Sequence, residues 1–264
     1  MKYKIGVCQF EPKLLDLEYN RNKMQEMVDG IKADLIVFPE LATGGYVFKN
    51  HEEVDSVSEP FKTGQTAKMF KKIAKRNDCS YVIGYSEKEG DDIYNSAMLI
   101  NPGGQIYNYR KIHLFYEEKI WFKPGNTDFK VLSAKKEVRV GMMVCFDWIF
   151  PESARTLMLK GAQVLAHPAN LVLPWCQEAM KTRCLENRVF AATCNRIGTE
   201  KNGEKRQHFT GMSQITDTKG RILKRLGENE ERVYISEVEI DEANDKNVTE
   251  YNHIISDRRP NFYD

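Results

Sequence analysis

The sequence lacks several features that would place a chain in a specialised class. Its 264 residues contain no run of about 18 apolar residues, so we expect no membrane partner and no membrane-spanning helix. The formal net charge is only +1, which provides no electrostatic reason to expect a nucleic acid partner. No GxGxxG or Walker motif indicates a nucleotide cofactor.

The six cysteines also lack the spacing of a metal site. They lie at positions 8, 79, 145, 176, 184 and 194 without a CxxC pair, so we expect no metal. Their apolar surroundings are typical of reduced thiols. The first ten residues, MKYKIGVCQF, do not contain the apolar run of a signal peptide. We therefore expect a cytoplasmic protein.

Apolar stretches with strand-like and helical spacing alternate along the chain. Strands are expected over residues 4–10, 34–38, 81–85, 164–166, 189–195 and 233–238. Helices are expected around residues 24–31, 67–74 and 154–161 and over 174–188. Hairpins over 96–109 and 212–226 interrupt this alternation twice, which indicates two related α/β halves.

No linker rich in proline, glycine or serine separates the halves, so we predict one domain over residues 1–264. The apolar strands need cover on both faces. The fold class is therefore predicted as α/β, with two sheets packed face to face and helices on their outer sides.

Three chemically active side chains end or follow apolar strand patterns. Glu40 ends LIVFPE, Lys111 follows QIYNYR and Cys145 ends GMMVC. Ligands in α/β folds collect at the carboxyl ends of strands, so we expect these residues to converge. Glu40 would take the thiol proton as a general base while Cys145 attacks an electrophilic carbon. Lys111 would stabilise the thiolate and the oxyanion of a tetrahedral intermediate.

Each of these residues also has a purely structural interpretation. A free cysteine is among the most buried residue types, and an exposed position is the default for a lysine. A thiol dyad of Cys145 with His113 is a further alternative. The apolar neighbours of His113 favour a packed, structural histidine instead.

Three segments, in order, resemble the signature blocks of a known family. They are FPELATGGY around Glu40, YRKIHLF around Lys111 and CFDWIFPESAR around Cys145, with HPANLV and RCLENRVF downstream. These blocks resemble those of the nitrilase superfamily of carbon–nitrogen hydrolases, most closely its small single-domain aliphatic amidase and nitrilase branch. The resemblance covers nearly the whole chain. It implies a four-layer αββα sandwich, with two stacked mixed β-sheets flanked by helices, and an enzyme without a cofactor.

The resemblance also implies a role for each residue. Cys145 is the nucleophile, Glu40 the general base and Lys111 the oxyanion stabiliser. A second glutamate in the loop after the lysine is functional in these enzymes. Glu118 is the better match by similarity to relatives with this loop, and Glu117 remains the alternative.

The implied reaction cleaves a small, aliphatic amide through a thioester on the cysteine and releases ammonia and a carboxylic acid. A small nitrile is the nearest alternative substrate. A non-catalytic homologue that binds a metabolite or a protein is less favoured, because a binding module does not need all three active residues. The family further implies a homodimer, or a higher oligomer, in which the tail from about 241 to 264 packs on the partner subunit.

Weaker candidates for substrate contacts lie near the signature blocks. Aromatic side chains there are expected to line a pocket, and the backbone N–H of Phe146 is expected to bind the oxyanion. The candidates are Tyr46, Tyr116, Phe146, Trp148, His167 and Asn170. The family usually has threonine where Gly44 stands, which predicts a looser loop at this position.

Overall fold

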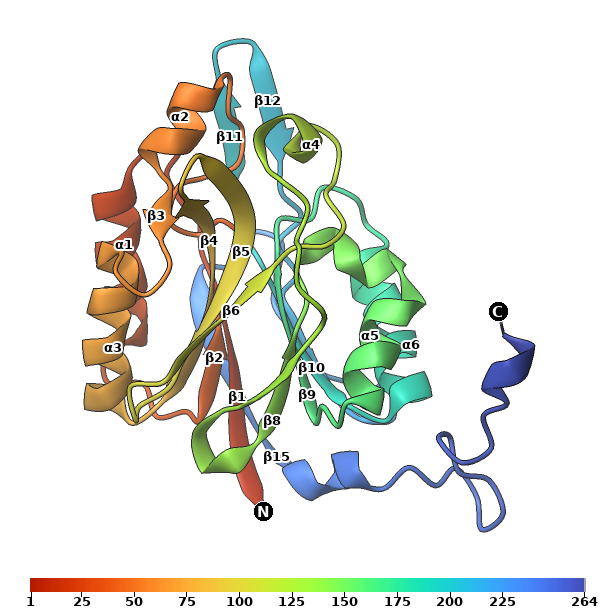
Figure 1. The fold of residues 1–264 in the computed structure, drawn as a ribbon. Coiled ribbons are helices and arrows are strands. Elements are labelled where there is room, and N and C mark those ends of the chain that lie inside the picture. Colours follow the sequence, from red (N-terminus) through yellow and green to blue (C-terminus); the bar gives the residue numbers. More distant parts are fainter. Residues whose placement is uncertain (264) are drawn as a thin grey trace.

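The structure, a computed structural model, describes residues 1–263 and contains two β-sheets packed face to face (Figure 1). The first sheet has the strand order β15-β1-β2-β4-β5-β6, with β3 paired to β4. Its strands are β1 (Lys2–Gln9), β2 (Leu35–Val37), β3 (Glu59–Pro60), β4 (Ser80–Glu89), β5 (Asp92–Ile100), β6 (Ile106–Arg110) and β15 (Arg232–Glu239). Parallel pairs join β1, β2 and β4, and antiparallel pairs add β5, β6 and β15, so the sheet is mixed.

The second sheet has the order β14-β13-β10-β9-β8-β7. Its strands are β7 (Val131–Ser133), β8 (Arg139–Met142), β9 (Val164–Ala169), β10 (Phe190–Asn195), β13 (Gln214–Thr216) and β14 (Ile222–Arg225). The three central strands β8, β9 and β10 are parallel, and the outer strands pair antiparallel with them, so this sheet is mixed as well.

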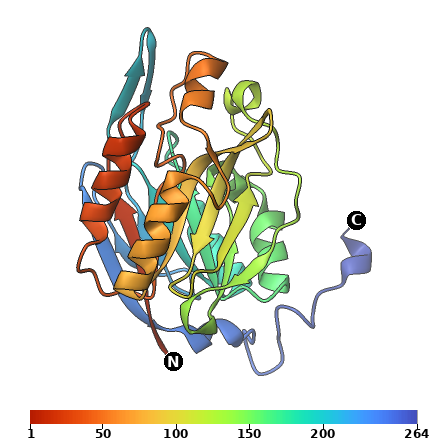
Figure 2. The same cartoon turned by 60° about the vertical axis from the view of Figure 1, so that its left-hand side comes forward.

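Helices cover the outer face of each sheet. The helices α1 (Leu17–Val28) and α3 (Gln65–Asn77) lie side by side on the first sheet, as Figure 2 shows. The helices α5 (Pro151–Leu159) and α6 (Cys176–Asn187) lie on the second. In α3 the buried Ala67, Phe70 and Ala74 recur at helical spacing and form the face that packs on the sheet. The predicted four-layer αββα sandwich is confirmed.

The structure differs from the predicted elements mainly in short or polar segments. The hairpin of β11 (Thr199–Asn202) and β12 (Lys205–His208) was not predicted, because its polar sequence has no apolar alternation. The same holds for the short helices α2 (His51–Ser56) and α4 (Glu118–Trp121). The short 3-10 turn η1 (Lys135–Glu137) precedes β8.

One predicted strand end, the one at Cys145, was wrong. The strand β8 ends at Met142, so Cys145 does not close it. Cys145 instead begins a 3-10 turn, η2 (Cys145–Ile149), which leads into α5. The apolar residues Met143 and Val144 extend the strand pattern in sequence, although they pair no further with β7.

The chain beyond β15 leaves the sandwich. After the turn η3 (Ile240–Asn244) it extends away from the main body towards η4 (Pro260–Phe262) (Figure 1). Lys246 fixes the start of this tail, because its Nζ donates hydrogen bonds to the carbonyls of Asn187 and Arg188 at the end of α6. None of the helices described within residues 1–263 has both the length and the apolar character needed to cross a membrane.

Candidate active site

Glu40 follows β2 in a loop that packs tightly on β4. Its buried Oε1 accepts hydrogen bonds from Lys111 Nζ and from Asn95 Nδ2, both at 2.7 Å. Its second oxygen, Oε2, has no hydrogen-bond partner within residues 1–263. Gly84 in β4 makes this close packing possible, because a Cβ there would lie 2.5 Å from Glu40 Cα. The loop therefore presents a buried carboxylate with one oxygen available to accept a proton.

Lys111 directly follows β6 and lies between two carboxylates. Its buried Nζ is 2.7 Å from Glu40 Oε1 and 2.7 Å from Glu118 Oε2. Burial alone lowers the pKa of a lysine, but the charges of Glu118 and Glu40 outweigh it here. The pKa of Lys111 is therefore held above its usual value, and the side chain is a cation at every physiological pH.

The two glutamates of the following loop point to different places. Glu118 is buried against Lys111 and accepts a hydrogen bond from the Tyr46 hydroxyl at 2.8 Å. Burial raises the pKa of Glu118 to about 7, although Lys111 opposes this shift. Glu117 instead pairs with Lys205 at 2.8 Å and is one third exposed. Glu118, and not Glu117, contacts Lys111.

Cys145 begins η2 with a φ of 41°, in the left-handed region that non-glycine residues rarely adopt. Such a conformation costs about 1–3 kcal/mol and persists only where its surroundings hold it. Burial raises the pKa of the Cys145 thiol, and the Glu40 charge adds to this effect while Lys111 opposes it. The thiol is therefore protonated at neutral pH, and it needs a base when it attacks.

Two buried polar residues hold this turn in place. Asp147 accepts hydrogen bonds from the Val144 N–H at 2.8 Å and from the Tyr109 hydroxyl at 2.7 Å. Its other carboxylate oxygen lies 2.7 Å from His113 Nδ1. His167 Nε2 lies 2.9 Å from the carbonyl oxygen of Cys145. Both histidines thus support the turn, and within residues 1–263 no hydrogen bond joins His113 to the Cys145 thiol.

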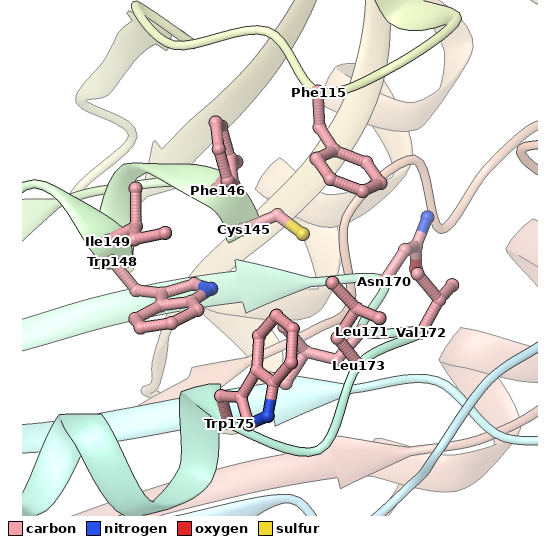
Figure 3. A pocket seen from close by; sticks show the side chains of 10 residues that line it. All are labelled: Phe115, Cys145, Phe146, Trp148, Ile149, Asn170, Leu171, Val172, Leu173 and Trp175. Carbon is pink, nitrogen blue, oxygen red and sulfur yellow. The ribbon is translucent and has the colours of Figure 1, made fainter.

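A cavity of about 50 Å³ opens beside Cys145, and Figure 3 shows the thiol pointing into it. A volume of this size holds roughly three to five non-hydrogen atoms, since one water needs about 10–15 Å³ on the same scale. Cys145 and Asn170 are the polar residues of its wall, and the others are apolar: Phe115, Phe146, Trp148, Ile149, Leu171, Val172, Leu173 and Trp175.

Asn170 is the polar group that faces the thiol across this cavity (Figure 3). Its side chain is 3% exposed, and within residues 1–263 neither its oxygen nor its nitrogen has a hydrogen-bond partner. An unpaired buried amide is unfavourable by about 1–3 kcal/mol. The arrangement therefore leaves one donor and one acceptor ready for a polar ligand.

The structure distributes the six candidate contact residues over three places. Phe146, Trp148 and Asn170 line the cavity at Cys145. Tyr46 and the largely exposed Tyr116 line a second cavity below the β11–β12 hairpin. His167 is fully buried at the turn that contains Cys145.

Several residues at the site were not found by sequence reasoning. The apolar wall from Leu171 to Trp175 carries no signal, because apolar side chains near a strand end are equally typical of a core. Asn95, which contacts Glu40, did carry a signal in the sequence, because it is a polar residue within the apolar pattern of β5.

The loop after Glu40 is not loose, contrary to the expectation from Gly44. The Gly44 N–H donates to the Leu41 carbonyl at 3.2 Å, and its own carbonyl accepts from the Leu15 N–H at 2.9 Å. A Cβ at this position would lie 2.7 Å from Val57 Cβ. The glycine makes room for Val57 in a well-packed loop.

A thiol within the electrostatic reach of a buried lysine and two carboxylates, on an αββα sandwich, combines a nucleophile, a cation and bases in one site. Residues 4–246 match the family model described as carbon–nitrogen hydrolase. The chain therefore belongs to the carbon–nitrogen hydrolase family, within the nitrilase superfamily, and acts on carbon–nitrogen bonds other than peptide bonds.

Three known proteins illustrate the extent of this similarity. A nitrilase from Pyrococcus abyssi is 41% identical over 98% of each chain. An (R)-stereoselective amidase from Pseudomonas sp. is 31% identical over 90% of this chain and 86% of its own. The crystal structure of an amidase from Nesterenkonia sp., 25% identical, superposes with a TM-score of 0.77 over 92% of each chain. The family resemblance noted in the sequence is confirmed.

Proposed function

We propose that the protein hydrolyses a small, neutral amide with an apolar acyl group through a thioester on Cys145, without a cofactor. The observation that carries this proposal is the placement of Glu40, Lys111 and Glu118 in one buried cluster beside a thiol that faces a small apolar cavity. Within residues 1–263 no group of three or more His, Cys, Asp or Glu side chains could hold a metal ion.

In the first half of the reaction, Cys145 Sγ bonds to the amide carbon while the thiol proton moves to Glu40 Oε2, the oxygen without a partner. The carbonyl electrons move to its oxygen, and Lys111 and the Phe146 N–H stabilise that oxyanion. As the intermediate collapses, the carbon–nitrogen bond breaks, the nitrogen takes the proton from Glu40 and ammonia leaves. A thioester remains on Cys145.

In the second half, a water molecule replaces the ammonia. Glu40 takes one proton from this water, and the water oxygen attacks the thioester carbon. The carbon–sulfur bond breaks, Glu40 returns the proton to the sulfur of Cys145, and a carboxylic acid leaves. Throughout, Glu118 keeps Lys111 in position through hydrogen bonds at 2.7 and 2.8 Å.

The cavity wall supports a neutral acyl group. No Lys, Arg or His is among the residues that line it. A substrate carboxylate placed there would lose its hydration without gaining a cationic partner, which is unfavourable by several kcal/mol. Asn170 can instead bind the amide group of the substrate, because its own amide offers both a donor and an acceptor.

A nitrile is the second candidate substrate, and the 41% identity to the Pyrococcus abyssi nitrilase favours it. The same two halves apply to a nitrile, except that Cys145 first forms a thioimidate, and one additional water adds to it before ammonia leaves. We rank it second because the side-chain oxygen of Asn170, an acceptor, finds no N–H on a nitrile.

Ammonia release from matched pairs of short amides and nitriles tests this proposal. We expect turnover of acetamide and propionamide, slower turnover of the matching nitriles, and little or none of the charged succinamate. Cys145→Ala should abolish turnover, while Cys184→Ala, at another buried cysteine, should retain it. Glu40→Gln should lower kcat by about 10²–10⁴-fold. Absence of turnover on every compound, with Cys145 unreactive to iodoacetamide, would refute the proposal.

We also propose that the chain forms a single functional domain that works as a homodimer in a reducing compartment, the cytoplasm. The tail beyond η3 carries large apolar side chains that this chain does not cover, among them Tyr251 at 85% exposed and Phe262 at 72%. Apolar surface of this kind is typical of an interface. All six cysteines are free thiols, as is usual in reducing surroundings.

A further inference from the structure

The β11–β12 hairpin stands apart from both main sheets, beside α2 and α4 (Figure 1). It contacts two loops that come from different parts of the chain. One is the loop 46–48, which follows Glu40, and the other is the loop that contains Glu117 and Glu118. A hairpin that pairs with neither main sheet thus contacts the segment that follows Glu40 and the segment that leads into Glu118.

The side chain of Glu200 in β11 binds the backbone of the first of these loops. Its Oε1 accepts hydrogen bonds from the N–H groups of Tyr46 at 2.7 Å and Val47 at 2.5 Å. Gly45 has a φ of +87°, and a Cβ there would lie 2.8 Å from Glu200 Oε2. The loop can therefore close on this carboxylate because position 45 is a glycine.

Arg196 holds Glu200 from the other side. Its Nη1 lies 2.7 Å from Glu200 Oε2, and both side chains are nearly fully buried. The Arg196 guanidinium also stacks on Phe209, 4.1 Å from the ring centroid, and Phe209 packs edge-to-face on Tyr46 at 5.9 Å. Tyr46 is thus fixed twice, through its backbone by Glu200 and through its ring by Phe209.

Tyr46 transmits this placement to the catalytic cluster. Its hydroxyl donates to Glu118 Oε1 at 2.8 Å, and Glu118 in turn binds Lys111. A hydrogen bond donated to a carboxylate favours its charged form, so the Tyr46 hydroxyl lowers the pKa of Glu118. The position of Tyr46 therefore affects how readily Glu118 stays ionised near neutral pH.

The second strand of the hairpin binds the second loop. Lys205 Nζ lies 2.8 Å from Glu117 Oε2 and donates to the Phe48 carbonyl at 3.1 Å. The first loop is bound again at the end of β11, where Asn202 Nδ2 donates to the Val47 carbonyl at 2.9 Å. Both loops are therefore tied to the same hairpin on either side of the Tyr46–Glu118 contact.

We propose that the β11–β12 hairpin is a clamp that sets the position and the protonation of Glu118 through Tyr46, with Glu200 and Arg196 as positioning residues. The inference rests on the proposed role of Glu118 in holding Lys111. When Glu118 takes up a proton, its hold on Lys111 weakens, so kcat/KM falls on the acid side. A damaged clamp raises the pH at which this fall occurs.

The pH dependence of kcat/KM for Glu200→Gln tests the clamp. We expect the acid limb to move to higher pH by about 1–2 units, the size of one lost hydrogen bond to a charged group, and kcat to fall about 10-fold. Tyr46→Phe should produce the same shift. The double variant should shift no further, because both changes act on the same contact between Tyr46 and Glu118. Glu204→Gln, at the exposed turn of the same hairpin, is the matched control and should behave like the wild type.

An acid limb that does not move in Glu200→Gln, or shifts that add in the double variant, would overturn the clamp. A lower kcat with an unchanged acid limb would do so too, because it indicates a general structural role. The pH dependence of Cys145 alkylation by iodoacetamide, followed by intact mass, gives a second readout without turnover. If the proposed function is wrong but the clamp is right, the variants show no turnover of amides, yet the pH dependence of alkylation still shifts. If the clamp is wrong, the enzyme turns over amides, but the pH dependence of alkylation does not shift in the variants.

Discussion

At the scale of single residues, the charge balance of the site depends on Lys111. Its ammonium lies within 2.8 Å of two carboxylates, and all three side chains are almost fully buried. Buried ion pairs of this kind contribute little to stability while they are intact. Removal of one partner, however, leaves the other charges buried without a counter-ion, which is strongly destabilising. The site is therefore sensitive to the loss of one charge.

We predict that Lys111→Met lowers the free energy of unfolding by about 3–5 kcal/mol at pH 8. The loss should be smaller at pH 5, because the buried Glu118 has a raised folded-state pKa and becomes neutral there. The pKa of Glu118 is already raised to about 7, so its destabilising effect appears as pH rises from the unfolded-state pKa of about 4.5 through 7.

Urea unfolding at both pH values measures this difference. Lys119→Met, at an exposed position next to Glu118 on α4, is the matched control and should change stability by less than about 0.5 kcal/mol. An equal loss at pH 5 and pH 8 would contradict the assignment to unpaired carboxylates.

Asn170 gives a second prediction at this scale. Asn170→Leu keeps the approximate shape of the side chain but removes both unpaired polar atoms, so we expect unchanged or higher thermal stability. In contrast, kcat/KM for a neutral amide should fall by about 5–150-fold, as for the loss of a buried hydrogen bond worth about 1–3 kcal/mol. A melting temperature that falls together with activity would instead indicate a structural role.

At the scale of elements, strands and helices with a clear apolar period were predicted well. The hairpin of β5 and β6 and the helix α3 lie close to their predicted positions, because burial of one face determines the pattern. The β11–β12 hairpin has no such pattern, since its strands pair with each other outside the core and their contacts are polar. Its partners, Tyr46 and Glu117, lie far away in the sequence.

The packing of β4 against the Glu40 loop leads to a prediction at the element scale. Gly84→Ala would place a Cβ 2.4 Å from the Pro39 carbonyl oxygen, so the loop must move. We expect kcat to fall about 10- to 100-fold, since a displacement of about 1 Å in a catalytic group is that costly. Stability should fall by about 1–3 kcal/mol, the usual effect of overpacking.

Gly227→Ala is the matched control for this change. A Cβ at position 227 meets Glu230 Cβ at 3.6 Å, an ordinary contact, and no left-handed φ strains the backbone. Activity assays together with thermal melts separate the two variants. Full activity in Gly84→Ala would show that the Glu40 loop is not held by β4.

At the scale of the whole molecule, the proposed catalytic residues come from two different sheets. Glu40 and Lys111 follow strands of the first sheet, and Cys145 follows β8 of the second. The site therefore exists only when the two sheets pack face to face. The wall of the cavity beside Cys145 likewise combines Phe115, which follows β6 of the first sheet, with Asn170 and Leu171, which follow β9 of the second.

The extended tail leads to a prediction about assembly. Deletion of residues 247–264, which retains the anchoring Lys246, should convert a dimer into a monomer. Light scattering on a size-exclusion column measures the mass. The double variant Tyr251→Ser, Phe262→Ser should weaken the dimer without shortening the chain, because it removes the two most exposed large apolar side chains of the tail. A mass that stays dimeric after both changes would refute the role of the tail.

The sequence by itself determined the class of fold and the family, and it predicted Glu40, Lys111 and Cys145 as the residues of the site. Apolar periodicity follows from burial within each element, and the signature blocks are contiguous, so both can be read along the chain. Only the tertiary structure decided that Glu118 rather than Glu117 contacts Lys111, that Asn170 faces the thiol unpaired, and that Glu200 binds the Tyr46 loop. These are contacts between side chains from distant segments, and their geometry depends on how the two sheets and the loops pack.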